Sequence, residues 1–313
     1  MSATAPKPNV SGVYVDLGTL LSSRGWARDL KLFARQAARS MLLGETRSRF
    51  RGRGMEFEEV RPYQPGDDIR NIDWKVSARA GGTYTKLFCE ERERPIHIIV
   101  DQRNSMFFGS SQRFKSVLAA EIASALAWAA LAGSDRIGGQ VVGDYSESDI
   151  RAKRTKEAVL RLVRDLVAYN QQLPQTDPNQ TQQESKKTIA QVLEECRRLT
   201  RPGTAIFIIS DFYDFGPAAA KALSMLGRHT DISLIHIIDA LEKQLPFSGQ
   251  VAISDGNNRS SVQLSARVRA SFEEQYQTRQ AALLKAATRS RALYIQVATD
   301  ADPRRTLTQL FRK

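Results

Sequence analysis

The sequence predicts an α/β protein whose main domain is a doubly wound, mainly parallel β-sheet with helices on both faces. The main observation is that short apolar runs alternate with long helical segments over residues 96–313, a pattern typical of a parallel sheet covered on both sides. The second is composition: 313 residues with 42% hydrophobic and 26% charged content suit about two globular domains. A charged run at residues 90–95 separates them, so residues 1–95 are predicted to form a smaller α+β region.

Five apolar runs are predicted to be the strands of the sheet: Ile96–Val100, Ile137–Val142, Ala205–Ile209, Ile232–Ile238 and Leu293–Val297. Apolar residues at helical spacing predict helices at Arg113–Ala132, Lys156–Tyr169, Thr188–Leu199, Pro217–Leu226 and Ala266–Ala287. The polar composition of residues 170–185 favours a long loop, and the turn at residues 255–258 favours a surface hairpin.

The first region combines a basic segment with a segment rich in turn residues. Residues 28–43 have apolar and basic faces at helical spacing, which predicts an amphipathic helix. Residues 24–53 hold nine basic residues against two acidic ones, which makes this surface either the solvated face of a packed helix or a binding face for lipid or nucleic acid. Residues 56–79 are predicted to be a structured loop, and residues 83–88 alternate like a strand.

Net charge, cysteine content and hydropathy indicate which partners and which compartment to expect. A formal net charge of +12 favours anionic partners, whether nucleic acid, an acidic protein or anionic lipid. Cys89 and Cys196 form no disulfide framework and have no companion at metal-ligand spacing, which suits a reducing compartment. The first residues lack the pattern of a secretion signal, and the apolar stretch 117–131 is too short and interrupted to span a bilayer. We therefore expect a cytoplasmic protein without a transmembrane anchor.

Two carboxylates follow predicted strands of the sheet. Asp101 comes directly after Ile96–Val100, and Asp211 follows the run that ends at Ser210. Because ligands of open α/β sheets bind at the carboxyl ends of the strands, we expect both carboxylates to face one crevice, with Ser105 nearby. Oxygen ligands of this kind suit magnesium.

The segment from Asp101 to Ser105 resembles the metal-binding loop of the von Willebrand factor A fold. That fold's adhesion site uses Asp-x-Ser-x-Ser after the first strand, a Thr from a later loop and an Asp after the fourth strand. Asp101, Ser105 and Asp211 match this pattern, and either Thr188 or Thr181 could supply the Thr. Arg103 stands where the first serine is expected, so the resemblance implies a degenerate site.

The charge of Arg103 disfavours a metal at this position. A guanidinium ~4 Å from a divalent ion would be repelled by roughly 8 kcal/mol at an effective dielectric of about 20. We therefore expect no cofactor, and we expect Arg103 to lie between Asp101 and Asp211 as an internal cation. The alternative is that these carboxylates only cap helices and pair with surface bases.

A longer motif lies between Gly54 and Arg79. It contains Arg61-Pro62-Tyr63, Pro65-Gly66-Asp67-Asp68, Arg70 and Ile72-Asp73-Trp74, and it resembles the signature of the bacterial family called domain of unknown function 58. That resemblance implies a von Willebrand A-like region after the signature and a partnership with MoxR-type AAA+ ATPases in the assembly or maturation of protein complexes. It implies no established enzymatic activity.

The signature allows a structural and a functional interpretation. Its acidic and basic side chains could pair with one another while Tyr63, Ile72 and Trp74 pack the loop. The same cluster could instead present a partner-binding surface. The candidate partner-binding residues are therefore Asp101, Arg103, Ser105 and Asp211 at the sheet, and Arg61, Asp67, Asp68, Arg70 and Trp74 in the signature.

The expected function is that of a non-enzymatic interaction module, an adaptor that links a MoxR-type ATPase to an unidentified client protein. No Gly-rich phosphate-binding loop ending in Gly-Lys-Ser/Thr and no Gly-x-Ser-x-Gly elbow occurs in the sequence. Two alternatives remain open. One is a nucleic-acid or membrane-surface binder that uses the basic segments, including residues 151–156, and the other is a metal-dependent hydrolase that uses Asp101 and Asp211.

Overall fold

A computed structural model describes residues 12–32, 55–90, 95–172, 186–245, 249–254 and 259–311 of the chain. They fall into two compact units, one formed within residues 39–93 and the other by the rest of the chain.

The larger unit is built on a six-stranded sheet in the order β10-β7-β6-β3-β4-β5. Its strands are β3 (Pro95–Asp101), β4 (Arg136–Val142), β5 (Glu147–Lys153), β6 (Ala205–Ser210), β7 (Asp231–Ile238) and β10 (Leu293–Ala298). All neighbouring pairs are parallel except β4 and β5. The chain winds outward from β3 in one direction and from β6 in the other, so the predicted doubly wound sheet is confirmed and its switch point lies between β3 and β6.

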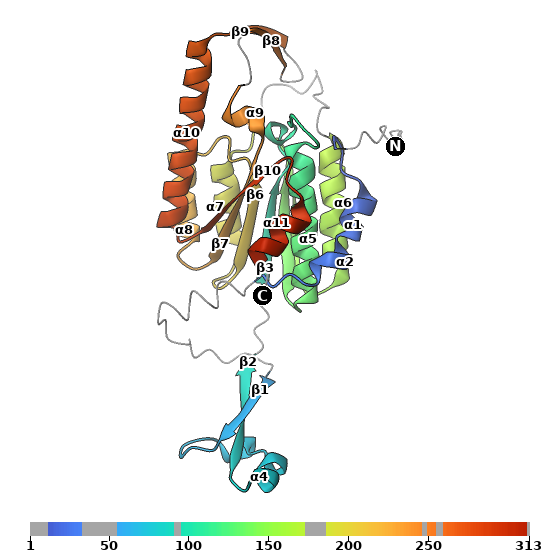
Figure 1. Ribbon diagram of the computed structural model, residues 1–313, viewed down its shortest axis with the longest axis vertical. Coiled ribbons are helices and arrows are strands. Elements are labelled where there is room, and N and C mark those ends of the chain that lie inside the picture. Colours follow the sequence, from blue (N-terminus) through green and yellow to red (C-terminus); the bar gives the residue numbers. More distant parts are fainter. Residues whose placement is uncertain are drawn as a thin grey trace. The chain divides into compact units, whose positions relative to one another are not determined.

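Helices cover both faces of this sheet (Figure 1). One face packs against α5 (Lys115–Ala132) and α6 (Lys156–Gln172), and the other against α7 (Ile189–Leu199), α8 (Pro217–Leu226) and α10 (Ala266–Arg289). Alternate strand residues enter the two cores: Ile98 and Val100 lie in the first, Ile99 in the second. Each strand is therefore apolar on both sides, which explains the continuous apolar runs in the sequence.

Helix α5 is the central helix of the larger unit. Among the described residues it is the one helix with the length and apolar composition of a membrane span, and 83% of that stretch is buried inside the fold. Its many alanines favour a helix and allow close packing. The burial is that of a core helix enclosed by neighbouring elements.

The short elements complete the larger unit. They are α1 (Leu17–Ser22), α2 (Arg24–Ala27), a 3-10 turn at Asn104–Met106, α9 (Ala240–Lys243), the hairpin of β8 (Gly249–Ser254) and β9 (Arg259–Leu264), and α11 (Pro303–Phe311). The predicted hairpin is confirmed by the antiparallel pairing of β8 and β9. Strand β5 is absent from the predicted strands because charged residues dominate it, as is common for an edge strand.

The predicted boundary at residue 95 needs a correction on its N-terminal side. Residues 12–32 belong to the larger unit, because Leu20 and Ala27 are buried in the core with α5 and the Ser23 hydroxyl lies 3.2 Å from that of Ser124. The predicted helix over residues 28–43 lies largely outside the described residues, and residues 28–32 form no regular helix. Residues 173–185 of the predicted polar loop also lie outside them.

The smaller unit holds the signature. Strands β1 (Met55–Pro62) and β2 (Tyr84–Glu90) pair antiparallel, with a 3-10 turn at Ile69–Asn71 and helix α4 (Trp74–Ala80) between them. The prediction of a loop over residues 56–79 is therefore wrong at both ends. Asp73 starts α4 by accepting hydrogen bonds from the backbone N–H groups of Lys75 and Val76, a stabilising N-cap. Pro62 stands at the last residue of β1, where a strand tolerates proline.

Candidate functional site at the carboxyl edge of the sheet

The fold brings the two predicted carboxylates to the switch point of the sheet. Asp101 is the last residue of β3 and Asp211 follows β6, the strand paired with β3. Ser210 joins the two positions, since its hydroxyl donates to Asp101 Oδ2 at 2.6 Å. Both carboxylates are buried. The two carboxylates therefore lie at the same edge of the sheet, but they line separate small pockets, Asp211 with His236 and Asp101 with Arg103.

Arg103 is an internal cation, but its second partner differs from the one predicted. Its Nε donates to Asp101 Oδ1 at 3.0 Å and its Nη2 donates to Asp101 Oδ2 at 2.8 Å. The outer side of the guanidinium binds Asp214, at 2.9 Å from Nη1 to Oδ2 and 3.0 Å from Nη2 to Oδ1. The prediction placed Asp211 here. Asp214 lies on the turn after β6 and reaches Arg103, whereas Asp211 is held by a different cation.

That second cation is Lys115, the first residue of α5. Its ammonium donates to Asp211 Oδ2 at 2.7 Å and also to a carboxylate oxygen of Glu242 in α9. The Lys115 side chain is 1% exposed. This edge of the sheet thus contains two separate ion-paired groups, Asp101–Arg103–Asp214 and Asp211–Lys115–Glu242.

The protonation of these groups follows from burial and pairing. Burial opposes the charge on Lys115, but its two carboxylate partners raise its pKa above the ordinary value. Burial would likewise raise the pKa of Asp211, yet the Lys115 ammonium brings it below the usual range. For Glu242 burial wins and the pKa is raised. Arg103, despite burial, has its pKa raised by Asp101 and Asp214 and stays a cation.

The other predicted metal ligands have local partners. The Ser105 hydroxyl donates to Asp211 Oδ1 at 3.3 Å, so Ser105 does lie beside Asp211. Thr188 caps α7 by accepting from Gln191 N, while the carbonyl of its neighbour Lys187 accepts from Arg103 Nη1 at 3.0 Å. Thr181, the other candidate, lies outside the described residues.

These residues do not form a coordination sphere for a divalent cation. Cationic side chains already bind the oxygens of Asp101 and Asp211 that a metal would need. Among the residues that the structure describes, no group of three or more His, Cys, Asp or Glu side chains is arranged to hold a metal ion. The donor set therefore does not fit the magnesium that an intact adhesion site would hold.

A further buried carboxylate orders the loop after β3. Asp239, which follows β7, accepts from the Ser110 backbone N–H at 2.8 Å and from the hydroxyls of Ser110 and Thr299 at 2.5 and 2.7 Å. These hydrogen bonds lower its pKa although burial opposes this. Asp239 stands directly after an apolar run, the same signal that marks Asp101 and Asp211. Asp214, Lys115 and Glu242 carry no such signal.

Three exposed aromatic side chains lie on loops at this edge of the sheet. Phe108, Tyr145 and Tyr213 follow β3, β4 and β6, and 39%, 43% and 61% of their surfaces are exposed. All three strands run in one direction, so the three loops lie at the same edge of the sheet. Exposed aromatic residues around a rigid, desolvated centre are the composition that protein-binding surfaces favour.

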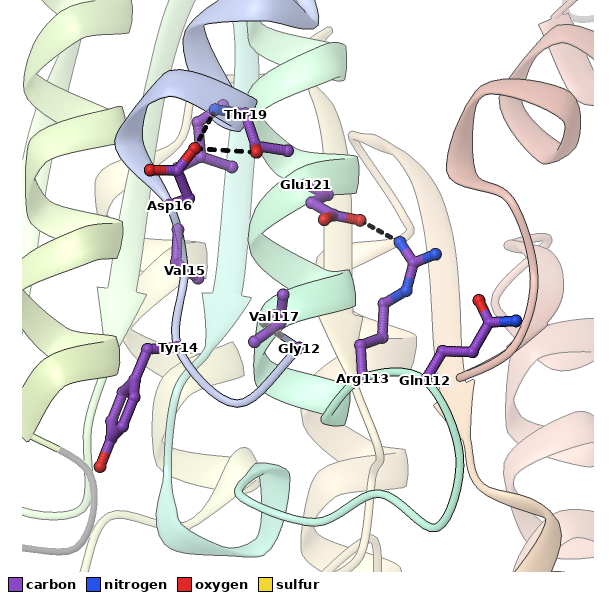
Figure 2. Close-up of a pocket in the computed structure, with 10 residues that line it drawn as sticks. Gly12, Tyr14, Val15, Asp16, Thr19, Gln112, Arg113, Val117 and Glu121 are labelled. Carbon is purple, nitrogen blue, oxygen red and sulfur yellow. Dashed lines mark hydrogen bonds and ion pairs between the residues drawn. The ribbon is translucent and has the colours of Figure 1, made fainter. Parts of the chain in front are cut away.

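A separate cavity lies elsewhere in the larger unit. It measures about 450 Å³ and lies between residues 12–20 and the start of α5 (Figure 2). Asp16 faces it while its carboxylate caps α1 through Thr19, and Arg113 pairs with Glu121 on its other wall. The charged side chains in this cavity thus have local structural partners.

In the smaller unit the signature residues divide into paired and exposed ones. Arg61 pairs with Asp67 at 2.7 Å, and Asp68 caps the 3-10 turn by accepting from the backbone of Arg70. The structural interpretation of these polar residues is therefore supported. Trp74 was expected to pack the loop, but 70% of it is exposed because it stands at the first turn of α4.

The comparisons with known proteins agree with the signature. Residues 59–282 match the model of a family described as "Protein of unknown function DUF58". Uncharacterized proteins of Mycobacterium bovis and Mycobacterium tuberculosis, Mb1516 and Rv1480, are each 26% identical over 232 residues, covering 74% of this chain and 70% of the relative.

Two solved structures are also similar. The conserved hypothetical protein BatB from Bacteroides thetaiotaomicron has a TM-score of 0.42 at 15% identity, over 69% of this chain and 96% of that one. A von Willebrand factor type A protein from Catenulispora acidiphila has a TM-score of 0.37 at 13% identity, over 73% of this chain and 42% of that one. The matched signature and the family model lead to one conclusion: the chain belongs to the DUF58 family.

Proposed function

We propose that this protein is a non-enzymatic interaction module that partners a MoxR-type AAA+ ATPase in the assembly or maturation of a protein complex. In this proposal the carboxyl edge of the sheet recruits the client protein. The observation that carries it is that Phe108, Tyr145 and Tyr213 are exposed aromatics on loops at the same edge of the sheet as the buried ion pairs. Such side chains supply large contact areas at low cost in conformational entropy.

The ion pairs support binding rather than catalysis. Arg103 and Lys115 are each shared by two carboxylates, and these fixed pairs support the proposal of a binding role. In the proposal these two cations replace the metal that a von Willebrand A-like site would use, and the partner is captured without a metal. A hydrolase that uses Asp101 and Asp211 would need both carboxylates to exchange their cationic partners for a metal.

The test is a pull-down with a MoxR-type AAA+ ATPase from the same organism, with and without nucleotide. The native chain should retain the ATPase or a ternary complex with a client. A variant with Phe108, Tyr145 and Tyr213 all replaced by Ala should retain at least about tenfold less client than the native chain. A matched control replaces three exposed apolar residues of α7 and α10, Leu199, Val268 and Leu284, by Ala. No complex under any nucleotide condition, or equal losses in both variants, would count against the proposal.

A further inference from the structure

A groove lies along the outer edge of the sheet, where strand β5 meets helix α6. In the described residues β5 pairs with β4 alone and ends the sheet. The groove has a volume of about 400 Å³. Its floor is apolar, formed by the buried side chains of Ile150 and Ala158. Its walls carry three basic side chains, one hydroxyl and one carboxylate: Arg151, Lys153, Arg161, Thr155 and Glu157.

The backbone of β5 offers hydrogen-bonding groups to this groove. The carbonyl of Asp149 accepts from Arg161 Nη2 at 3.3 Å, so it points away from β4 and toward α6. In an antiparallel strand the N–H and C=O of one residue point to the same side, so the N–H of Asp149 points outward as well. Arg161 is itself an exposed side chain, 59% accessible, that a partner strand could displace.

The positive charge around the groove indicates what kind of molecule would bind there. Residues 151–164 contain six Lys or Arg residues, all exposed, and a single acidic residue, Glu157. Such a surface attracts an anionic chain. Within residues 147–172, all of which the structure describes, no aromatic side chain is exposed, so the stacking contacts typical of single-stranded nucleic acid are missing here. Outward backbone groups and an apolar floor favour a polypeptide.

We propose that this groove binds an acidic, extended segment of a partner protein, which adds to the sheet as a strand antiparallel or parallel to β5. The segment would pair with the backbone around Asp149, place small apolar side chains on Ile150 and Ala158, and place carboxylates on the three basic side chains of the walls. The groove is separate from the carboxyl edge: Lys153 pairs with Ile137 at the start of β4, whereas Glu147 pairs with Val142 at its end. A second docking site at the opposite end of β4 goes beyond client capture at the carboxyl edge.

The test uses fluorescence anisotropy with a labelled peptide of alternating Glu and Val, seven residues long to match β5. The full-length native chain should bind it, with an affinity that falls as salt rises. Arg151→Glu combined with Lys153→Glu should weaken binding by at least about tenfold. The matched control, Lys221→Glu with Arg228→Glu on and after α8, changes the net charge equally at exposed positions and should stay within about twofold. Arg151→Gln with Lys153→Gln repeats the test with a milder change.

Two further probes decide how the peptide binds. A peptide N-methylated at alternate residues loses outward donors and should bind at least about tenfold more weakly if it pairs as a strand. The proposal would be overturned if the methylated peptide or a Lys–Val peptide bound as tightly as the Glu–Val peptide. It would also be overturned if the Arg151/Lys153 variant and the Lys221/Arg228 control bound the Glu–Val peptide equally. Tighter binding of a single-stranded oligothymidine that is lost in the Arg151/Lys153 variant would overturn it as well, since the groove would then be a nucleic-acid site. Each of these outcomes is independent of the client-capture test, which uses the Phe108, Tyr145 and Tyr213 variant at the carboxyl edge.

Discussion

The guanidinium of Arg103 joins Asp101, at the end of β3, to Asp214, on the turn after β6. Nη2 lies 2.8 Å from Asp101 Oδ2, and Nη1 lies 2.9 Å from Asp214 Oδ2. This bridge spans the switch point of the sheet, where open α/β sheets bind their ligands. The Arg103 side chain thus links the end of β3 to the turn after β6, which lies 111 residues farther along the chain.

Replacing Arg103 tests the structural weight of this bridge. Arg103→Met leaves Asp101, whose side chain is 3% exposed, without its cation, so the free energy of unfolding should fall by about 3–5 kcal/mol. Urea denaturation measures the change. The control is Arg197→Met, which breaks the exposed pair with Glu194 on α7 and should cost less than about 1 kcal/mol. Equal effects of the two substitutions would contradict the bridge.

Lys115 should behave as the centre of a charge group. Lys115→Met leaves Asp211 and Glu242 facing each other without the shared ammonium, and we expect a loss of about 3–5 kcal/mol in unfolding free energy. Adding Asp211→Asn removes one of the stranded charges and should recover part of that loss. A double-mutant cycle by urea denaturation measures the coupling. Strictly additive effects would mean that the two side chains do not interact.

Metal titration distinguishes carboxylates that are held by side-chain cations from the carboxylates of a functional adhesion site. Calorimetric titration of the native chain with MgCl₂ or MnCl₂ should give no saturable heat, because Arg103 and Lys115 hold the carboxylates. Arg103→Ser, which restores the serine of the adhesion-site pattern, should bind Mg²⁺ more tightly than the native chain. Tight binding of Mg²⁺ to the native chain would refute the replacement of the metal by side-chain cations.

His236 should make stability depend on pH. Burial lowers its pKa from 6.5 to about 4, and its Nδ1 lies 2.7 Å from Tyr294 Oη. Between these pH values the unfolded chain binds a proton that the folded chain does not, so stability falls as the pH drops. The native chain should lose roughly 2 kcal/mol more than His236→Gln between pH 7 and pH 5. Urea denaturation at both pH values checks this, and parallel losses in the two proteins would disprove it. His97, whose pKa burial also lowers, is present in both and cancels.

Gly139 should tolerate no side chain. A Cβ at this position in β4 would lie 2.4 Å from the carbonyl oxygen of Ile98 on the neighbouring strand, so Gly139→Ala should destabilise the fold by at least about 1–3 kcal/mol. The control is Gly25→Ala in α2, where a Cβ meets nothing within 4 Å and should be neutral or stabilising. Thermal unfolding of both variants measures the difference, and an unchanged melting temperature for Gly139→Ala would contradict the close approach of the strands.

Much of the fold could be predicted from local sequence. The five predicted strands and the five main helices bury apolar faces, so their periodicity is visible in the residues themselves. Strand β5 was missed because an edge strand contacts solvent and carries charges that hide its pattern. The α4 helix was missed because Pro65 and Gly66 dominate the segment before it, while Asp73 caps a helix of only seven residues.

The sequence by itself determined the doubly wound sheet, the positions of Asp101 and Asp211 at strand ends, and the presence of a cation at Arg103. Only the tertiary structure decided which charges meet. Lys115, Asp214 and Glu242 come from α5, a turn and α9, and the farthest of them, Glu242, lies 141 residues from Asp101 in the sequence. Ion pairing depends on distances of a few ångströms in space, which strand order and helix packing set and which local periodicity does not contain.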